Sequence, residues 1–232
     1  MTTQDVTLVT KIDNLFQAGF KLHQEGRLAD AQSLYAEVLA LNAHHFDALH
    51  LSGLLAAQSG QPDVAVNLIK KAIVINSGDA SAYKNLGIAL HNLENYVEAV
   101  DSYRCALNIE PNDPEAFYNI GNAYLARSIF DEAIASYEKA INLNPSHSKA
   151  HLNLGIALHE LGHHTLAIAS FDLAIGLNPG FAEAFFSRGL AFEAIKELDA
   201  ALVDYERALI FSPEHVDARL HRESTLLALG LK

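Results

Sequence analysis

The sequence predicts an all-α protein, a solenoid of helix hairpins of equal length. Three observations lead to this prediction. Glycines recur every 34 residues, apolar residues within each 34-residue repeat follow helical spacing, and glycine or proline stands where several of the helices must end. The recurring glycines are Gly19, Gly53, Gly87, Gly121, Gly155 and Gly189. Because no insertion interrupts this period, one repeated helix hairpin accounts for most of the chain.

The period divides the chain into six repeats with a short extension at the start and a half-repeat at the end. We expect residues 1–11 to extend the first helix. The six repeats are 12–45, 46–79, 80–113, 114–147, 148–181 and 182–215. Two hypotheses fit residues 216–232: a truncated seventh repeat, or a C-terminal capping helix in which the polar Arg219, Arg222 and Glu223 replace residues that full repeats bury.

Each repeat is expected to form two amphipathic helices. Numbered from the first residue of a repeat, positions 4, 7, 8 and 11 are mostly apolar or small in the first helix, and positions 20, 24 and 27 are apolar or small in the second. A large residue faces a small one at this spacing, which lets two helices approach closely. The large residues at position 24 are Tyr35, Ile69, Tyr103, Tyr137, Phe171 and Tyr205.

Turn and cap residues mark the ends of these helices. Asp113-Pro114-Glu115 supplies a cap, a proline at the first helical position and an acid in the first turn. Pro62 opens the second helix of its repeat in the same way. Glycines at position 15 separate the two helices, and prolines at position 32 stop the second helix because they lack an amide proton. These residues are Gly26, Gly60 and Gly162, and Pro111, Pro145, Pro179 and Pro213. Ala43 and Ser77 replace the proline in the first two repeats, where we expect looser helix ends.

The repeat resembles the tetratricopeptide repeat. The segment from His151 to Pro179, HLNLGIALHELGHHTLAIASFDLAIGLNP, has its order of large, small and helix-ending residues. The resemblance covers Ile12 to Lys232. It implies a right-handed superhelix in which the first helices line a concave groove and the second helices form the convex outside. It also implies a non-enzymatic adaptor or scaffold that binds a peptide segment of a partner protein in that groove.

The composition disfavours several other classes of function. Sixteen Lys and Arg residues against 28 Asp and Glu residues give a formal net charge of −12, which disfavours binding to nucleic acids and to anionic membranes. No apolar run is long enough to span a membrane, and no secretory signal is visible, so we expect a cytoplasmic protein. The single Cys105 excludes an intramolecular disulfide.

One motif is typical of zinc enzymes. His159-Glu160-Leu161-Gly162-His163 matches HExxH, in which two histidines one helical turn apart bind zinc and the glutamate activates water. The repeat places His159 near the end of a first helix and His163 beyond the turn, so the two imidazoles need not share a face. No nucleophile motif or phosphate-binding loop is present. We therefore expect no enzyme activity, no cofactor and no metal site, and we expect the twelve histidines to lie mainly on surfaces and turns.

Asparagines recur on the stripe of the first helices that packing leaves uncovered. Asn85, Asn119 and Asn153 share position 6, and Asn122 lies at position 9. An amide side chain has two donor protons and an acceptor, so a ladder of amides can pair with the backbone of an extended peptide of any sequence. The alternative is that these asparagines only follow the consensus of the family.

Lysines and aromatic residues complete the predicted groove. Lys84, Asn119 and Lys149 match three of the five places of the carboxylate clamp that chaperone-binding members of the family use, whereas Ile88 and Asn153 stand at the other two. This resemblance implies a partial clamp for an acidic or C-terminal group. The apolar anchors are expected to be Phe16, Phe20, Tyr118 and Phe186.

Two further hypotheses stay open. The asparagine ladder is similar to that of the superhelix in O-linked GlcNAc transferases, which implies a substrate-recruiting region of a larger glycosyltransferase with a catalytic domain beyond Lys232. Alternatively, the apolar end from Leu226 to Leu231 mediates formation of a homo-oligomer.

Overall fold

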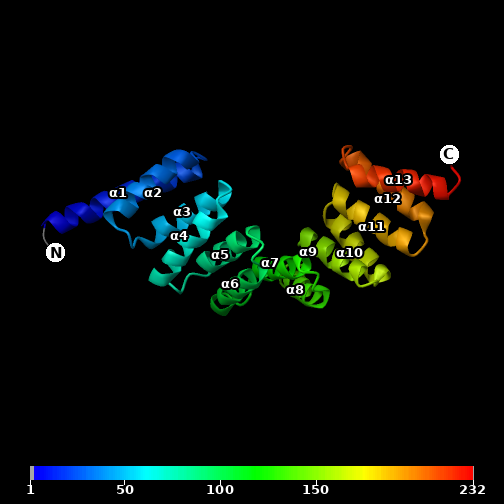
Figure 1. The fold of residues 1–232 in the computed structure, drawn as a ribbon, viewed down its shortest axis with the longest axis horizontal. Coiled ribbons are helices and arrows are strands. Elements are labelled where there is room, and N and C mark those ends of the chain that lie inside the picture. The colour runs from blue at the N-terminus through cyan, green and yellow to red at the C-terminus, as the bar shows by residue number, and fades with distance from the viewer. Residues whose placement is uncertain (1–2, 232) are drawn as a thin grey trace. The chain divides into compact units, whose positions relative to one another are not determined.

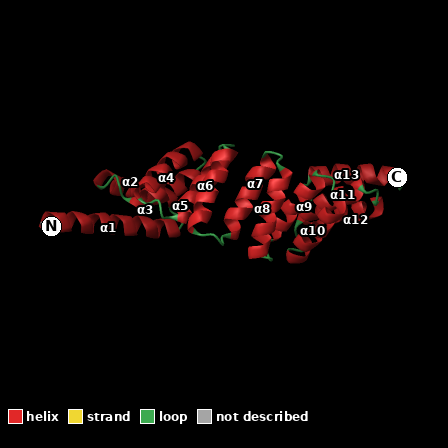
Figure 2. Ribbon diagram, turned by 90° about the horizontal axis from the view of Figure 1, so that it is seen from below, coloured by secondary structure: helices red, strands yellow, loops and turns green. Residues whose placement is uncertain are grey.

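The computed structural model describes residues 3–231, and every regular element in that range is a helix (Figures 1 and 2). The all-α prediction is thereby confirmed. The chain divides into two compact units, one ending at Pro111 and the other beginning at Asn112. The first unit contains α1 (Thr3–Gln24), α2 (Leu28–Leu41), α3 (Phe46–Gln58), α4 (Pro62–Ile75), α5 (Ala80–Asn92) and α6 (Tyr96–Ile109). The second contains α7 (Pro114–Ala126), α8 (Phe130–Leu143), α9 (Ser148–Glu160), α10 (His164–Leu177), α11 (Ala182–Ala194), α12 (Leu198–Phe211) and α13 (Val216–Ala228).

Within each unit the helices form stacked hairpins. Every helix packs against the next one along the chain, and odd-numbered helices also contact each other, as α3 does with α5 and α9 does with α11. The odd-numbered helices are the first helices of the repeats. The helix α1 has 22 residues, whereas α3 has 13, because α1 begins at Thr3 and not at Ile12.

The recurring glycines lie where a second helix presses its largest side chain against a first helix. A Cβ atom on Gly87 would lie 2.5 Å from the ring of Tyr103, and one on Gly155 would lie 2.5 Å from the ring of Phe171. Both rings are almost completely buried. Only glycine leaves room for this contact, which explains the 34-residue period in physical terms.

The turn inside each hairpin has a left-handed residue at position 15. Its φ angle is 77° at Gly26 and 81° at Gly162, but also 58° at Glu94, 56° at Ser128 and 68° at Lys196. The following amide closes the turn on the end of the first helix, as Arg27 does by donating to the carbonyl of Leu22 at 2.9 Å. The hairpin imposes this backbone even where the residue is not glycine.

Asparagines end several of the second helices. Asn42 Oδ1 accepts a hydrogen bond from the amide of His44, and the same turn recurs at Asn76, Asn144 and Asn178. The helices α2 and α4 have 14 residues each, as α8 and α10 have. The expected loosening at Ala43 and Ser77 is therefore not seen, because the asparagine turn ends the helix without a proline.

Candidate functional site on the first helices

All the predicted binding residues lie on first helices of the two compact units. In the first unit they are Phe16 and Phe20 on α1 and Lys84 and Asn85 on α5. In the second unit they are Tyr118, Asn119 and Asn122 on α7, Lys149 and Asn153 on α9, and Phe186 on α11.

In the first unit, Asn85 joins two first helices. Its amide nitrogen lies 2.8 Å from Nε2 of His50 on α3. Burial lowers the pKa of His50, while the carboxylates of Asp79 and Asp47 act in the opposite direction. The imidazole is therefore neutral at pH 7, and its unprotonated Nε2 accepts the amide proton. Asn85 is thus engaged in packing α3 against α5.

The aromatic residues of α1 differ in exposure. The rings of Phe16 and Phe20 stack with centroids 6.3 Å apart, and Phe16 also contacts Tyr35 of α2. Phe20 is 38% exposed, whereas Phe16 is half-buried. Lys84, on α5, is also half-buried. Phe20 is therefore the most accessible of the predicted anchors in this unit.

In the second unit, two of the asparagines form a bridge between helices. Asn153 donates from Nδ2 to Oδ1 of Asn122 at 2.8 Å and to the hydroxyl of Tyr118 at 3.4 Å. The hydroxyl of Tyr137, on α8, donates to the same Asn122 oxygen at 2.9 Å. Burial raises the pKa of Tyr137, so this hydroxyl keeps its proton. The bridge fixes the side chains of α7, α8 and α9 in place.

Asn119 and Lys149 are not part of this bridge. Asn119 is half-buried and Lys149 is exposed. No other group within residues 3–231 forms a hydrogen bond with the Asn119 side chain or an ion pair with Lys149. These two side chains keep their donors and acceptor available for a ligand.

Phe186 has a different environment from the one expected of an exposed anchor. It is 9% exposed and packs in a core cluster with Tyr205 and Ala208. Its ring centroid lies 4.6 Å from that of His215 and 6.0 Å from that of Tyr205. Contacts with α12 and with His215, which precedes α13, cover this ring, so Phe186 contributes mainly to the fold.

A histidine cap that was not predicted from the sequence recurs before three of the first helices. His147 precedes α9, and its Nδ1 accepts a hydrogen bond from the amide of Ala150 at 3.3 Å. Its ring lies 4.6 Å from that of Tyr118, and its Nε2 lies 3.3 Å from Oε1 of Glu115. His215 repeats these contacts before α13 with Ala218, Phe186 and Glu183. In the first unit, His45 caps α3 and stacks against Phe16.

A signal for these caps is present in the sequence. Histidine stands at position 34 only in the three repeats that have Phe or Tyr at position 5. The other three repeats pair His50 with Asp79, Lys84 with Asp113 and Leu152 with Phe181 at these two positions. Comparing positions 5 and 34 across the repeats could therefore have indicated the contact.

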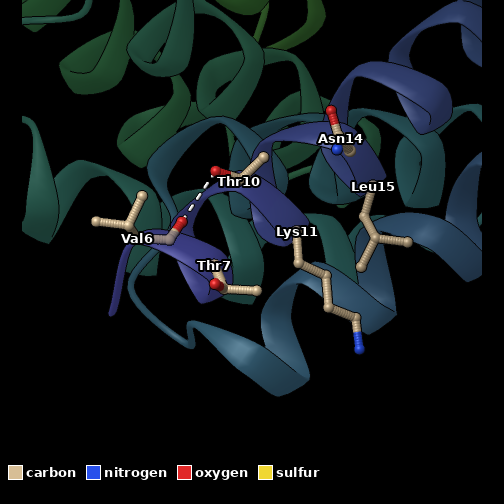
Figure 3. A pocket seen from close by; sticks show the side chains of 6 residues that line it. All are labelled: Val6, Thr7, Thr10, Lys11, Asn14 and Leu15. Carbon is tan, nitrogen blue, oxygen red and sulfur yellow. Dashed lines mark hydrogen bonds between the residues drawn. The ribbon is translucent and has the colours of Figure 1, made fainter. Parts of the chain in front are cut away.

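A surface cavity is lined by none of these residues (Figure 3). It has a volume of about 560 Å³ and is lined by one side of α1, from Val6 to Leu15. Thr10 donates its hydroxyl proton to the carbonyl of Val6 at 2.9 Å, so this polar group is engaged within the helix. The cavity contains none of the predicted binding residues.

His159, the first histidine of the HExxH motif, contacts His164 and not His163, the second histidine of the motif. Nδ1 of His159 lies 3.1 Å from Nδ1 of His164, and His163 is exposed. Among residues 3–231, no group of three or more His, Cys, Asp or Glu side chains is placed to hold a metal ion. In the same range, no helix combines the length and the apolar character that crossing a membrane requires.

Stacked helix hairpins with repeated contacts define a helical repeat protein. Models described as tetratricopeptide or TPR repeats match residues 22–87, 92–128, 121–162, 148–181 and 174–216. The chain therefore belongs to the tetratricopeptide repeat family. A search of curated proteins finds no match to the sequence.

Solved structures agree with this assignment. The crystal structure of MamA is 27% identical with a TM-score of 0.67, and the match covers 71% of this chain and 96% of MamA. The first TPR of Spaghetti (RPAP3), bound to the HSP90 peptide SRMEEVD, is 29% identical with a TM-score of 0.50, over 50% of this chain and 93% of that one. PilF of Pseudomonas aeruginosa is 19% identical with a TM-score of 0.77, over 96% of this chain and 99% of PilF, and shows the fold alone.

Proposed function

We propose that this protein is a non-catalytic adaptor or scaffold that binds a peptide segment of a partner protein on the first-helix faces of its repeats. The observation that carries this proposal is the pair of unengaged polar side chains, Asn119 and Lys149, beside the ordered bridge of Asn122 and Asn153. Tetratricopeptide repeats are typically interaction modules, and the similar repeat of RPAP3 is bound to a peptide. Both facts support the proposal.

The chemistry of the two side chains suggests how a peptide is held. The Asn119 amide can donate to a backbone carbonyl and accept from a backbone amide, which requires no particular peptide sequence. Lys149 can pair with an acidic side chain or with a C-terminal carboxylate. Because Lys149 is exposed, such an ion pair contributes only about 0–1 kcal/mol. We expect weak, transient binding that depends on several such contacts.

A capture experiment with matched variants tests the proposal. The test protein is Asn119→Ala/Lys149→Ala, and the control is Asn142→Ala/Arg207→Ala, which likewise removes one amide and one positive charge, from exposed positions on the second helices α8 and α12. We expect the control and the wild type to retain the same partners from a lysate and the test protein to lose them. Equal retention by all three proteins would contradict binding on the first-helix face.

Two finer predictions belong to this proposal, and a third concerns the alternative role as part of a larger enzyme. The protein acts in the cytoplasm, where it neither binds nucleic acid nor inserts into a membrane. A role as the recruiting region of a larger glycosyltransferase predicts a native mass well above 25.2 kDa. Engagement of Asn85 and Asn153 within the molecule favours the simpler adaptor. Self-association through Leu226 to Leu231 predicts dimers in light scattering at high concentration.

A further inference from the structure

The turn between α9 and α10 brings two imidazoles into direct contact. His159 lies near the end of α9, and His164 is the first residue of α10. Their Nδ1 atoms are 3.1 Å apart, and their ring centroids are 4.8 Å apart. Both residues are half-buried, whereas His163 between them in the sequence is exposed.

We propose that His159 and His164 form a two-ligand binding site for a divalent transition metal ion that prefers imidazole, with zinc as the representative ion. Zinc binds imidazole nitrogens at about 2.0–2.1 Å, so two ligand nitrogens in a tetrahedral site lie roughly 3.3–3.4 Å apart. The observed separation of the Nδ1 atoms is 3.1 Å. The rings therefore need to move apart by only a few tenths of an ångström to admit the ion.

The site differs from the zinc centre that an HExxH motif forms. The second histidine is His164, one residue beyond the motif, and the contact crosses the turn of the hairpin. Within residues 3–231, no third His, Cys, Asp or Glu side chain completes the set. Two coordination positions are therefore left for water or for a side chain of a bound partner, and the site binds a metal without the open, three-ligand arrangement of a catalytic zinc.

The same geometry also fits a hydrogen bond in which one Nδ1–H donates to the other Nδ1 without any metal. The two arrangements differ in their response to added zinc. A metal site binds zinc, and replacing either histidine removes one of its two ligands. A hydrogen-bonded pair does not bind the ion.

Calorimetric titration of the full chain with zinc, after removal of bound metal, separates these cases. The test variants are His159→Gln and His164→Gln, and His163→Gln is the control because it removes an exposed imidazole from the same turn. We expect each test variant to bind zinc at this site at least about tenfold more weakly than the wild type. The control should match the wild type. Equal binding by all four proteins, or no binding by the wild type, would overturn the proposal.

A second measurement keeps the test decisive if a variant unfolds. Imidazole ¹⁵N resonances of the wild-type chain, recorded with and without zinc, report on each histidine separately. Zinc should shift the Nδ1 signals of both His159 and His164. Shifts confined to the other ten histidines would place the metal elsewhere and contradict the proposal.

Discussion

The glycines of this protein differ in whether a methyl group could be added to them without a steric clash. In Gly155→Ala the new methyl would lie 2.5 Å from the buried ring of Phe171, whereas in Gly176→Ala it would meet nothing within 4 Å. We expect Gly155→Ala to destabilise the fold by about 1–3 kcal/mol through overpacking. Gly176→Ala should stabilise it by up to about 1 kcal/mol, because alanine favours a helix. Urea unfolding of the two variants measures both effects, and equal stabilities would refute the packing explanation of the period.

The left-handed turn residues provide a second test at this scale. Lys196 has a φ of 68°, a conformation that glycine adopts without strain in the equivalent turns. We expect Lys196→Gly to stabilise the protein by about 1 kcal/mol. Ala194→Gly, two residues earlier at the end of α11, should instead destabilise it by about 1 kcal/mol. Thermal unfolding distinguishes the two, and a loss of stability in Lys196→Gly would show that the turn stores no strain.

At the scale of helices, a buried ion pair joins α11 to α12, and we expect the stability of this helix pair to depend on it. Arg188 donates two hydrogen bonds of 2.7 Å to the buried Asp204 and a third to Asp172 of α10. The hydrogen bonds to Asp204 and the nearby carboxylates raise the pKa of Arg188, so it stays charged. Breaking such a pair on one side costs about 3–5 kcal/mol. We expect Asp204→Ser to lower the free energy of unfolding by somewhat less than this amount, because Asp172 remains as a partner for Arg188.

The preceding repeat supplies the control for this ion pair. Leu154 and Ser170 occupy the places there that correspond to Arg188 and Asp204. The double variant Arg188→Leu/Asp204→Ser should therefore recover most of the stability lost in Asp204→Ser, because it leaves no unpaired charge buried and Asp172 is exposed to solvent. Chemical denaturation of the single and double variants tests this, and additive losses would contradict it.

Acid should weaken the contact between α3 and α5. The pKa of His50 is lowered in the folded state by burial, whereas in the unfolded chain it is about 6.5. Above that value the imidazole is neutral in both states and its contribution is complete. As the pH falls below about 6.5, the unfolded chain takes up the proton more readily, so stability decreases until the folded-state pKa is passed. His159 contributes in the same direction.

Unfolding measured between pH 7 and 5 checks this dependence. His50→Gln keeps an acceptor for Asn85 but removes the titrating group, so its stability should vary less with pH than that of the wild type. His44→Gln, at an exposed loop position, should leave the dependence unchanged. Identical pH profiles for wild type and His50→Gln would show that other groups cause the loss.

At the scale of the whole molecule, the fold could be predicted from the sequence because each repeat restates the same packing rule. The recurring glycine and the large residue at position 24 are close in sequence, and their contact is the same in five further copies. Left-handed turns at Glu94, Ser128 and Lys196 could not be predicted locally, because these residues do not favour that conformation.

The candidate site was predictable only in part. The first-helix location of Asn119 and Lys149 follows from the helical period, whereas the engagement of Asn85 with His50 depends on a residue 35 positions earlier. Position 6 alone does not distinguish Asn119 from Asn153, since the difference lies in which neighbours are close enough to accept a proton. Hydrogen bonds between side chains of neighbouring repeats therefore decide which asparagines remain available to bind a peptide.

The most direct test of peptide binding on the first-helix faces is an NMR titration of the chain with a segment of a captured partner. We expect side-chain and backbone signals of Asn119 and Lys149 to shift with added segment, while those of Asn142 and Arg207 on the second helices stay in place. Shifts confined to Asn142, Arg207 and their neighbours would contradict it and assign the interaction to the second helices.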